Sequence, residues 1–266
     1  MSNLAVVYRP DSVEPMFRIY DWSSLSFRTF LTELAIVCLG ALIYFLVRGA
    51  VVDRFDEAVS NATGLIAIER SLGVFWESEM QRWVLASPLL VDFLNGAYFW
   101  GHMPVIGIIA VLLFTRSRAV YRFTRNTFVI SASIALIFYA FFPVAPPRLL
   151  PEYGFVDTLA LYGNASYQAQ ELGPFINPYA AVPSLHFGWA TLLSVGLWRA
   201  RSRSRNRHLL LLVAILLPVT QFFAVILTAN HFILDLVVGA GVATLAVLAA
   251  AFWEKRVLDS ANQWKT

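Results

Sequence analysis

The chain has 266 residues, of which 58% are hydrophobic and 14% are charged, and its formal net charge is +3. Its mean hydropathy is +0.64, which lies outside the usual range of soluble domains and indicates that the bilayer is its solvent. This composition leaves no room for a separate soluble domain. The single cysteine, Cys38, excludes an intramolecular disulfide and a cysteine metal cluster.

Apolar stretches of the length that a hydrocarbon core requires, roughly 20 residues for a helix, recur along the chain. They predict an all-α, polytopic membrane protein, a six-transmembrane-helix bundle. The predicted domains are a cytoplasmic N-terminal segment at 1–29, one membrane domain at 30–253 and a cytoplasmic tail at 254–266. We expect the spans at residues 30–47, 89–114, 126–142, 184–198, 209–227 and 232–253.

The first apolar stretch follows a charged segment and lacks a small-residue cleavage pattern, so we expect a retained anchor rather than a signal peptide. Between the first two spans, apolar residues recur at helical spacing beside charged ones, which predicts an outer interfacial helix. Such a helix either contacts lipid or only packs on the bundle. Its apolar residues are Leu65, Ile68, Leu72, Phe75 and Trp76, and its charged residues are Glu69, Arg70, Glu77 and Glu79.

Two short connections rich in arginine set the expected topology. By the positive-inside rule both face the cytoplasm, and the termini are then cytoplasmic as well. The connection at 144–182 lies outside and has one basic residue, Arg148, which agrees with this orientation. Nucleic-acid binding by the arginines is disfavoured, because the runs flank spans and lack interleaved aromatic residues. The runs are Arg116, Arg118, Arg122 and Arg125, and Arg199, Arg201, Arg203, Arg205 and Arg207.

Two histidines and an aspartate lie at the predicted outer ends of two spans, where ionisable groups are costly and need a partner or a function. His186 opens the fourth span, and His231 and Asp235 open the sixth. An i, i+4 spacing puts His231 and Asp235 on one helix face, so the carboxylate can bind one ring nitrogen and leave the other as a nucleophile. A structural pair that only holds helices together is the alternative.

Two features at the same level favour anion binding. Ser184 follows Pro183 and fits a helix N-cap, and the amides after it can bind an anion with the help of the helix dipole. Arg148 follows two prolines and presents a guanidinium that can bind two phosphate oxygens. Capping alone for Ser184, and an interfacial position for Arg148, are the alternatives.

The sequence resembles the type-2 phosphatidic acid phosphatase superfamily, and especially its branch of inositol phosphorylceramide synthases, the aureobasidin-sensitive inositolphosphotransferases. The resemblance covers residues 92–241. It rests on the motifs Asn95-x-x-Tyr98-x-x-x-His102, Phe142-Pro143-x-Ala145-Pro146-Pro147-Arg148, Asp157-Thr158-Leu159, Pro183-Ser184-Leu185-His186 and Thr228-Ala229-Asn230-His231-x-x-x-Asp235.

The resemblance implies a six-helix bundle in which His231 attacks phosphorus, Asp235 orients it and His186 protonates the departing oxygen. The wider superfamily also has a lysine before the first-motif arginine and an arginine six residues before the nucleophile. This chain has Phe141 and Val225 at these positions, so the phosphate charge must be balanced differently. We expect phosphate or substrate to be bound by Arg148, Ser184, His102, Tyr98, Asn95 and Asn230.

Phosphoryl transfer requires an in-line nucleophile, a proton for the leaving oxygen and fixed positive charge. No carboxylate cluster suggests magnesium and no histidine spacing suggests zinc, so we expect no metal and no cofactor. Transfer to an alcohol in preference to water further requires a dry pocket. Candidates for its walls, unless they face lipid, are Phe141, Phe142, Phe187 and Trp189.

The predicted function is a membrane phosphotransferase that acts on phosphorylated lipids through a phosphohistidine intermediate. A lipid phosphate phosphatase with water as the acceptor is one alternative, and a lipid or small-molecule transporter is another. The expected partners are a membrane lipid substrate and the bilayer, with no nucleic acid and the oligomeric state left open. We expect the site at the non-cytoplasmic face of a cell membrane or of a Golgi-like compartment.

Overall fold

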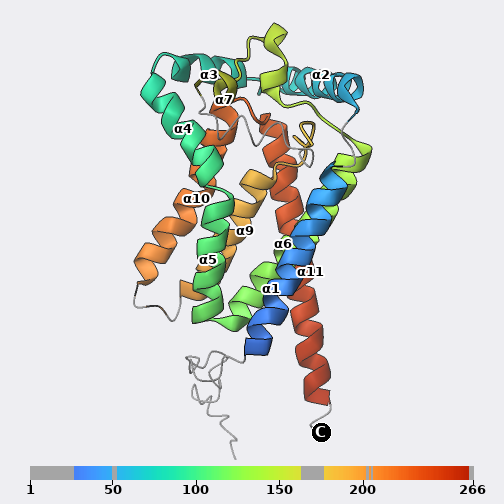
Figure 1. Ribbon diagram of the computed structural model, residues 1–266, viewed down its shortest axis with the longest axis vertical. Helices are drawn as coiled ribbons and strands as arrows, with labels where there is room; N and C mark the ends of the chain where they lie inside the picture. Colours follow the sequence, from blue (N-terminus) through green and yellow to red (C-terminus); the bar gives the residue numbers. More distant parts are fainter. Residues whose placement is uncertain (1–26, 50–52, 163–176, 202–203, 205, 264–266) are drawn as a thin grey trace, which may run out of the picture.

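The computed structural model describes residues 27–49, 53–162, 177–201, 204 and 206–263. Within these residues the regular secondary structure is helical, with turns and an isolated β-bridge between Val144 and Ala180 but no strand, so the all-α fold class is confirmed. Long helices form an elongated bundle, and α2 and α3 lie across one end of it (Figure 1). The helices are α1 (Phe27–Gly49), α2 (Phe55–Leu72), α3 (Glu77–Leu85), α4 (Pro88–Trp100), α5 (Met103–Arg116), α6 (Arg118–Phe141), α7 (Thr158–Tyr162), α9 (Leu185–Ala200), α10 (Arg207–Leu227) and α11 (Ile233–Gln263), with short 3-10 turns η3 (Pro147–Leu149) and η4 (Pro151–Tyr153).

Three predicted spans correspond to single helices that are long and apolar enough to cross a bilayer, namely α6, α10 and α11. The helices α4 and α5, with 13 and 14 residues, are each too short to cross a bilayer, and they form a fourth span only if they are taken together across a bend of 49°. The apolar stretch of α1 is shorter, and α9 has 16 residues, which rise only about 24 Å. By length and composition the described residues therefore support three or four spans, and the exact number of six is not supported.

The break in the predicted span 89–114 coincides with close packing at Gly101. A Cβ atom there would lie 2.2 Å from the carbonyl oxygen of Ala97 and 2.7 Å from Nε2 of Gln221 in α10. The Gln221 amide donates to that same carbonyl over 3.1 Å and so fills the space that a side chain would need. Pro104, in the first turn of α5, has no backbone N–H to continue the helix. His102 therefore lies at a corner between two helices.

The predicted interfacial helix is in fact two helices. Gly73 ends α2 in the left-handed region with φ of +69°, which glycine adopts without steric cost, and its amide donates to the carbonyl of Arg70 over 3.1 Å. The next helix, α3, begins at Glu77, so Phe75 and Trp76 belong to the connection. The apolar spacing continues across the turn, which is why it predicted one continuous helix.

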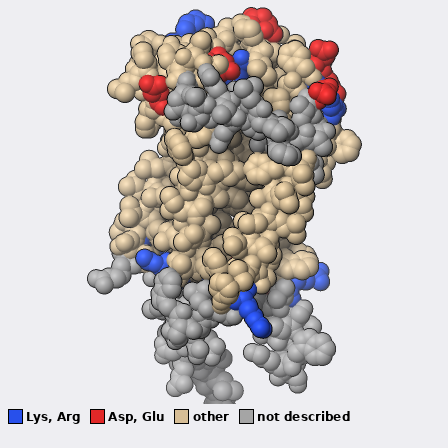
Figure 2. Space-filling view, in the orientation of Figure 1, with Lys and Arg blue, Asp and Glu red and all other residues tan. Residues whose placement is uncertain are grey.

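Both ends of the described chain lie at the end of the bundle opposite α2 and α3 (Figure 1). Lys and Arg side chains appear at this end in Figure 2, whereas the end with α2 and α3 carries charges of both signs. Exposed large apolar side chains cover the flanks, for example Leu34, Ile108, Leu216 and Val237. A lateral surface of this kind fits lipid, and the chain is a multi-pass membrane protein.

The predicted boundaries of the domain at 30–253 differ from the helix ends. α11 continues to Gln263, so most of the predicted tail at 254–266 extends the last helix. The predicted N-terminal segment at 1–29 lies almost entirely outside the described residues, which begin at Phe27 in α1.

Candidate active site

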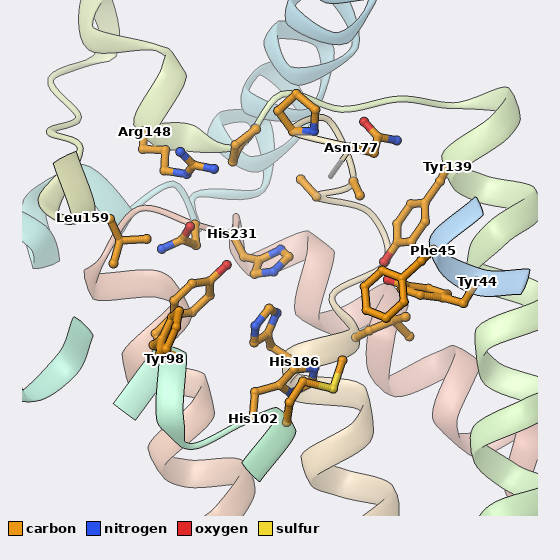
Figure 3. A pocket seen from close by; sticks show the side chains of 18 residues that line it. Tyr44, Phe45, Tyr98, His102, Tyr139, Arg148, Leu159, Asn177, His186 and His231 are labelled. Carbon is orange, nitrogen blue, oxygen red and sulfur yellow. The ribbon is translucent and has the colours of Figure 1, made fainter. Parts of the chain in front are cut away.

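A cavity of about 400 Å³ lies where α9 and α11 begin, and it brings together side chains that are far apart in the sequence. His186 and His231 face each other in it, with Arg148 on one side and Tyr98 on another (Figure 3). The ring centroids of the two histidines are 5.9 Å apart. His102 also lines the cavity, so three of the four histidines of the chain meet here.

His231 is buried, and Nδ1 of its ring lies 3.2 Å from Oδ2 of Asp235, which is fully buried. The basis of the sequence prediction was wrong in one respect. α11 begins at Ile233, so His231 precedes the helix and the pair does not share a helix face. The carboxylate reaches back because Oδ2 also accepts the amide of Phe232 over 2.8 Å, as in a helix cap. With Nδ1 occupied by Asp235, Nε2 is the ring nitrogen left for a substrate.

The turn before α11 is tight and directs His231 into the cavity. Ala229 adopts φ of +56°, a left-handed conformation that costs a residue with a Cβ roughly 1 kcal/mol. The amides of Asn230 and His231 both donate to the carbonyl of Val225, over 2.9 and 3.1 Å. The carbonyl of Ala229 accepts the amide of Arg148 over 2.8 Å, which ties this turn to the segment that follows α6.

His186 is held between aromatic rings. Tyr98 stacks on it with centroids 4.4 Å apart and planes 20° apart, and the ring of His102 lies 4.0 Å away on a tilted plane. His102 stacks in turn on Trp189 at 5.4 Å, and the Trp189 indole donates to Ser131 over 3.1 Å. The corner between α4 and α5 thus supplies two rings that restrict the orientation of His186.

Glycine at one position allows α9 and α11 to approach so closely that the two histidines meet. A Cβ atom on Gly239 would lie 2.5 Å from the carbonyl oxygen of Ser184, so only glycine fits. The amide of Ser184 donates to the carbonyl of Asp235 over 3.0 Å. Ser184 also caps α9, because its hydroxyl accepts the amide of Phe187 over 3.5 Å. Ser184 is fully buried and does not line the cavity.

Arg148 brings the permanent positive charge of the cavity lining, and in the described residues it is the one Lys or Arg that lines it. Its Nη1 lies 3.4 Å from Oδ2 of Asp157, and both side chains are largely buried. Oδ1 of Asp157 accepts the amide of Ala160, so the same carboxylate caps α7. The ion pair orients the guanidinium and balances part of its charge.

The other predicted binding residues separate into two groups. Asn230 lines the cavity, and its amide donates to the hydroxyl of Thr228 over 2.8 Å. Asn95 lies outside the lining and is buried against α7, where it exchanges two hydrogen bonds with Thr158 at 3.0 and 2.9 Å. Asn95 therefore connects α4 to α7. Sequence spacing alone does not distinguish this role from a position in the cavity.

The four aromatic residues that the sequence suggested as walls of a dry pocket do not line the cavity. Phe141 is 78% exposed and Phe142 41% exposed, and neither lines the cavity. Trp189 is buried behind His102, and Phe187 packs on Phe222. The apolar wall is formed instead by residues that were not predicted from the sequence, because they belong to no recognisable motif. They are Tyr44, Phe45, Met103 and Tyr139, which approach from α1, α5 and α6.

This arrangement can support transfer of an anionic group. It combines a carboxylate-backed imidazole, a second imidazole within reach of the same group and a guanidinium at the edge. The described residues include no group of three or more His, Cys, Asp or Glu side chains placed to hold a metal ion.

Comparison with known proteins gives one family match. A family model described as PAP2 superfamily matches residues 63–249, well over half of the chain, including α9, α10 and the start of α11. Neither the curated proteins nor the solved structures yielded a match.

Proposed function

Because the chain belongs to the PAP2 superfamily, whose members are phosphatases or phosphotransferases, we propose that it transfers the phosphoryl group of a membrane lipid through His231. The observation that carries this proposal is the facing pair His186 and His231 in one cavity, with Asp235 buried behind His231. A histidine that served only to pack helices would not need both a buried carboxylate and an open cavity in front of it.

The proposed reaction has two displacements. Nε2 of His231 attacks phosphorus and forms a P–N bond while the P–O bond to the leaving group breaks, and His186 donates a proton to the departing oxygen. An acceptor hydroxyl then attacks the phosphohistidine, its proton passes to His186, and the P–N bond breaks. Asp235 stabilises the imidazolium form of His231, and Arg148 binds the equatorial oxygens.

A second cavity supports a lipid substrate. It measures about 350 Å³, lies between α1, α5, α6 and α9, and is lined almost entirely by apolar side chains. It shares Tyr44, Phe45 and Met103 with the reaction cavity, so a molecule with its phosphate near His231 has an apolar space for its hydrocarbon chain. We assign this space to a tail of the lipid.

The finer proposal is that the acceptor is an alcohol, as in inositol phosphorylceramide synthases, rather than water. Two positions that are cationic in the wider superfamily are apolar here, Phe141 and Val225. Val225 is fully buried in a cluster with Ile226 and Leu236, so an apolar side chain occupies the position where the wider superfamily has an arginine. The loss of two cations leaves fewer charged groups to hold water near the site, which favours attack by a bound alcohol.

We further propose that the site faces the non-cytoplasmic side of the membrane and that all six apolar helical segments belong to the membrane bundle. The arginines at the ends of α5, α6 and α10 lie at the opposite end from the cavity, where the positive-inside rule places the cytoplasm (Figures 1 and 2). The proposed partners are the bilayer and its lipids, with no nucleic acid.

One assay tests the proposal. Purified protein in phospholipid vesicles receives radiolabelled phosphatidylinositol and increasing amounts of a lipid alcohol such as ceramide, and the products are separated. We expect a transfer product that increases with the alcohol at the expense of hydrolysis, and no product with His231→Ala. Hydrolysis that no alcohol affects would identify a phosphatase, and label that only crosses the bilayer would identify a transporter.

A further inference from the structure

The first turn of α11 is capped by three carboxyl groups from three different helices. The first amides of a helix have no partner within it and form the positive end of its dipole. Here the amide of Phe232 donates to Asp235, that of Ile233 to Oε1 of Glu77 in α3, and that of Leu234 to Oε1 of Glu69 in α2, each over 2.8 Å. The nucleophile candidate immediately precedes this turn.

Glu69 and Glu77 are an unusual choice for a cap, because both are fully buried. Two ionised carboxylates cannot lie together in a dry site without a large cost in free energy. Their second oxygens, both Oε2, have no hydrogen-bond partner in the described residues. A proton on one of the two side chains would let it donate to the other carboxylate, and it would reduce the charge of the pair to that of one carboxylate.

We propose that Glu69 and Glu77 are positioning residues that hold one proton between them and fix the first turn of α11. This turn keeps Asp235 and His231 aligned, and loss of the proton disables the site. This role presupposes the proposed function of His231. The proposal also gives the helices α2 and α3, which lie across the end of the bundle, a role in the reaction.

The pKa of Glu69 falls in a range that kinetics can cover. Burial, the hydrogen bond to Glu77 and the negative charges of Glu77 and Asp235 raise the pKa of Glu69 to about 9. Below this pH the cap contains two negative charges, those of the pair and of Asp235. Above it, three negative charges would crowd one helix end, and repulsion would push the cap away from the amides.

The surroundings offer little to offset the third charge. The groups that face Glu69 are Glu77 from α3 and Asp235 with its partner His231 from α11. The nearest basic residue of α2, Arg70, turns instead to the rings of Phe75 and Tyr153, 5.0 and 5.3 Å from its guanidinium carbon.

Steady-state kinetics from pH 6 to 10 test the proposal on the full chain in vesicles. For the unmodified protein we expect kcat to fall as pH rises through about 9, with KM nearly constant. Glu69→Gln can still accept the Leu234 amide and cannot ionise, so it should keep most of the activity at pH 7 and lose the alkaline fall. Glu69→Leu, which cannot accept the amide, should lower kcat at pH 7 by about tenfold or more with little change in KM.

Glu79→Gln is the matched control, because Glu79 lies on α3 but is exposed and pairs with Arg82 at the surface. It should reproduce the pH profile of the unmodified protein. An alkaline fall that is the same in Glu69→Gln as in Glu79→Gln would overturn the proposal.

Thermal unfolding separates this proposal from that of the function, because it needs no activity. The folded chain keeps the shared proton up to about pH 9, whereas an unfolded glutamate releases it near its ordinary pKa of 4.5. The stabilisation is therefore complete below pH 4.5 and is lost progressively as pH rises to about 9. Glu69→Gln should flatten this decline in the unfolding temperature. If the unfolding temperature of Glu69→Gln declined with pH as in the unmodified protein, the shared proton would be excluded even in an active enzyme. A flattened decline would support the shared proton even if no phosphoryl transfer were found.

Discussion

Gly239 of α11 lies directly against Ser184 of α9, and a Cβ atom at Gly239 would be 2.5 Å from the Ser184 carbonyl oxygen. Gly188 faces the same contact from α9, where an added Cβ would lie 3.1 Å from the carbonyl oxygen of Gly239. The two helices therefore meet backbone to backbone at the level of the cavity. This contact sets the distance between His186, on α9, and His231, just before α11.

Gly239→Ala should reduce activity by about a hundredfold while the protein still inserts and folds, because the added methyl group pushes α9 away and misplaces His186. Gly241→Ala on the same helix is the control, since a Cβ there meets nothing within 4 Å. The measurement is kcat of both purified variants, with size-exclusion profiles to verify folding. Equal activity of the two variants would show that the close contact does not matter for the site.

Removal of the proposed nucleophile should abolish turnover. We expect His231→Ala to lower kcat by at least about a thousandfold and Asp235→Asn by about a hundredfold or more, without loss of the folded protein. With a ³²P-labelled donor, the unmodified protein quenched in alkali should retain label that acid releases, as a phosphohistidine does. A His231→Ala protein that still acquires such label would assign the intermediate to another residue.

His186 should matter most when the leaving group is poor. His186→Ala is expected to slow transfer from a lipid phosphodiester by about a hundredfold to ten-thousandfold, because the departing alkoxide then receives no proton. A donor with a nitrophenol leaving group needs no proton and should react with the variant at a rate much closer to normal. The comparison of both donors in both proteins measures this, and an equal loss with the two donors would remove the role of His186 as the acid.

The apolar cavity should select for long hydrocarbon chains. Ala132→Phe fills part of the space between α1, α5 and α6, so KM for a long-chain donor should rise about tenfold while a short-chain donor is nearly unaffected. Val237→Phe is the control, because Val237 is 59% exposed on the flank of the bundle. A change in KM that does not depend on chain length would contradict the assignment of this cavity to the lipid tail.

Cysteine labelling tests the topology. In a Cys38→Ser background, Glu152→Cys in η4 should react with a membrane-impermeant thiol reagent in intact cells, and Asn206→Cys before α10 should react only with a permeant one. Both positions are exposed, so access to thiol reagents is not limited by packing. The opposite pattern would place the cavity on the cytoplasmic side.

Much of this protein follows from local sequence. Apolar stretches predict helices wherever they occur, because a backbone in lipid has to satisfy its own hydrogen bonds, and the all-α class needed no further information. His186, His231 and Asp235 could also be selected as candidates, since ionisable residues at the ends of apolar helices are costly and few, and the structure brings the two histidines into one cavity. Ser184 is recognisable as a cap for the same local reason, because its hydroxyl bonds an amide three residues further on.

Only the tertiary structure shows which side chains from different helices contact one another and which are buried. Gly101 and Pro104 are local helix breakers at the corner between α4 and α5, but the close fit at Gly101 involves a Gln221 side chain that comes from another helix. Asn95 looks like a binding residue in its motif, and only packing shows that it pairs with Thr158. The sequence also presents Glu69 and Glu77 as charges on the polar side of an amphipathic helix. They are buried because α2 and α3 fold over the start of α11, where unpaired amides provide the hydrogen bonds that compensate the loss of water.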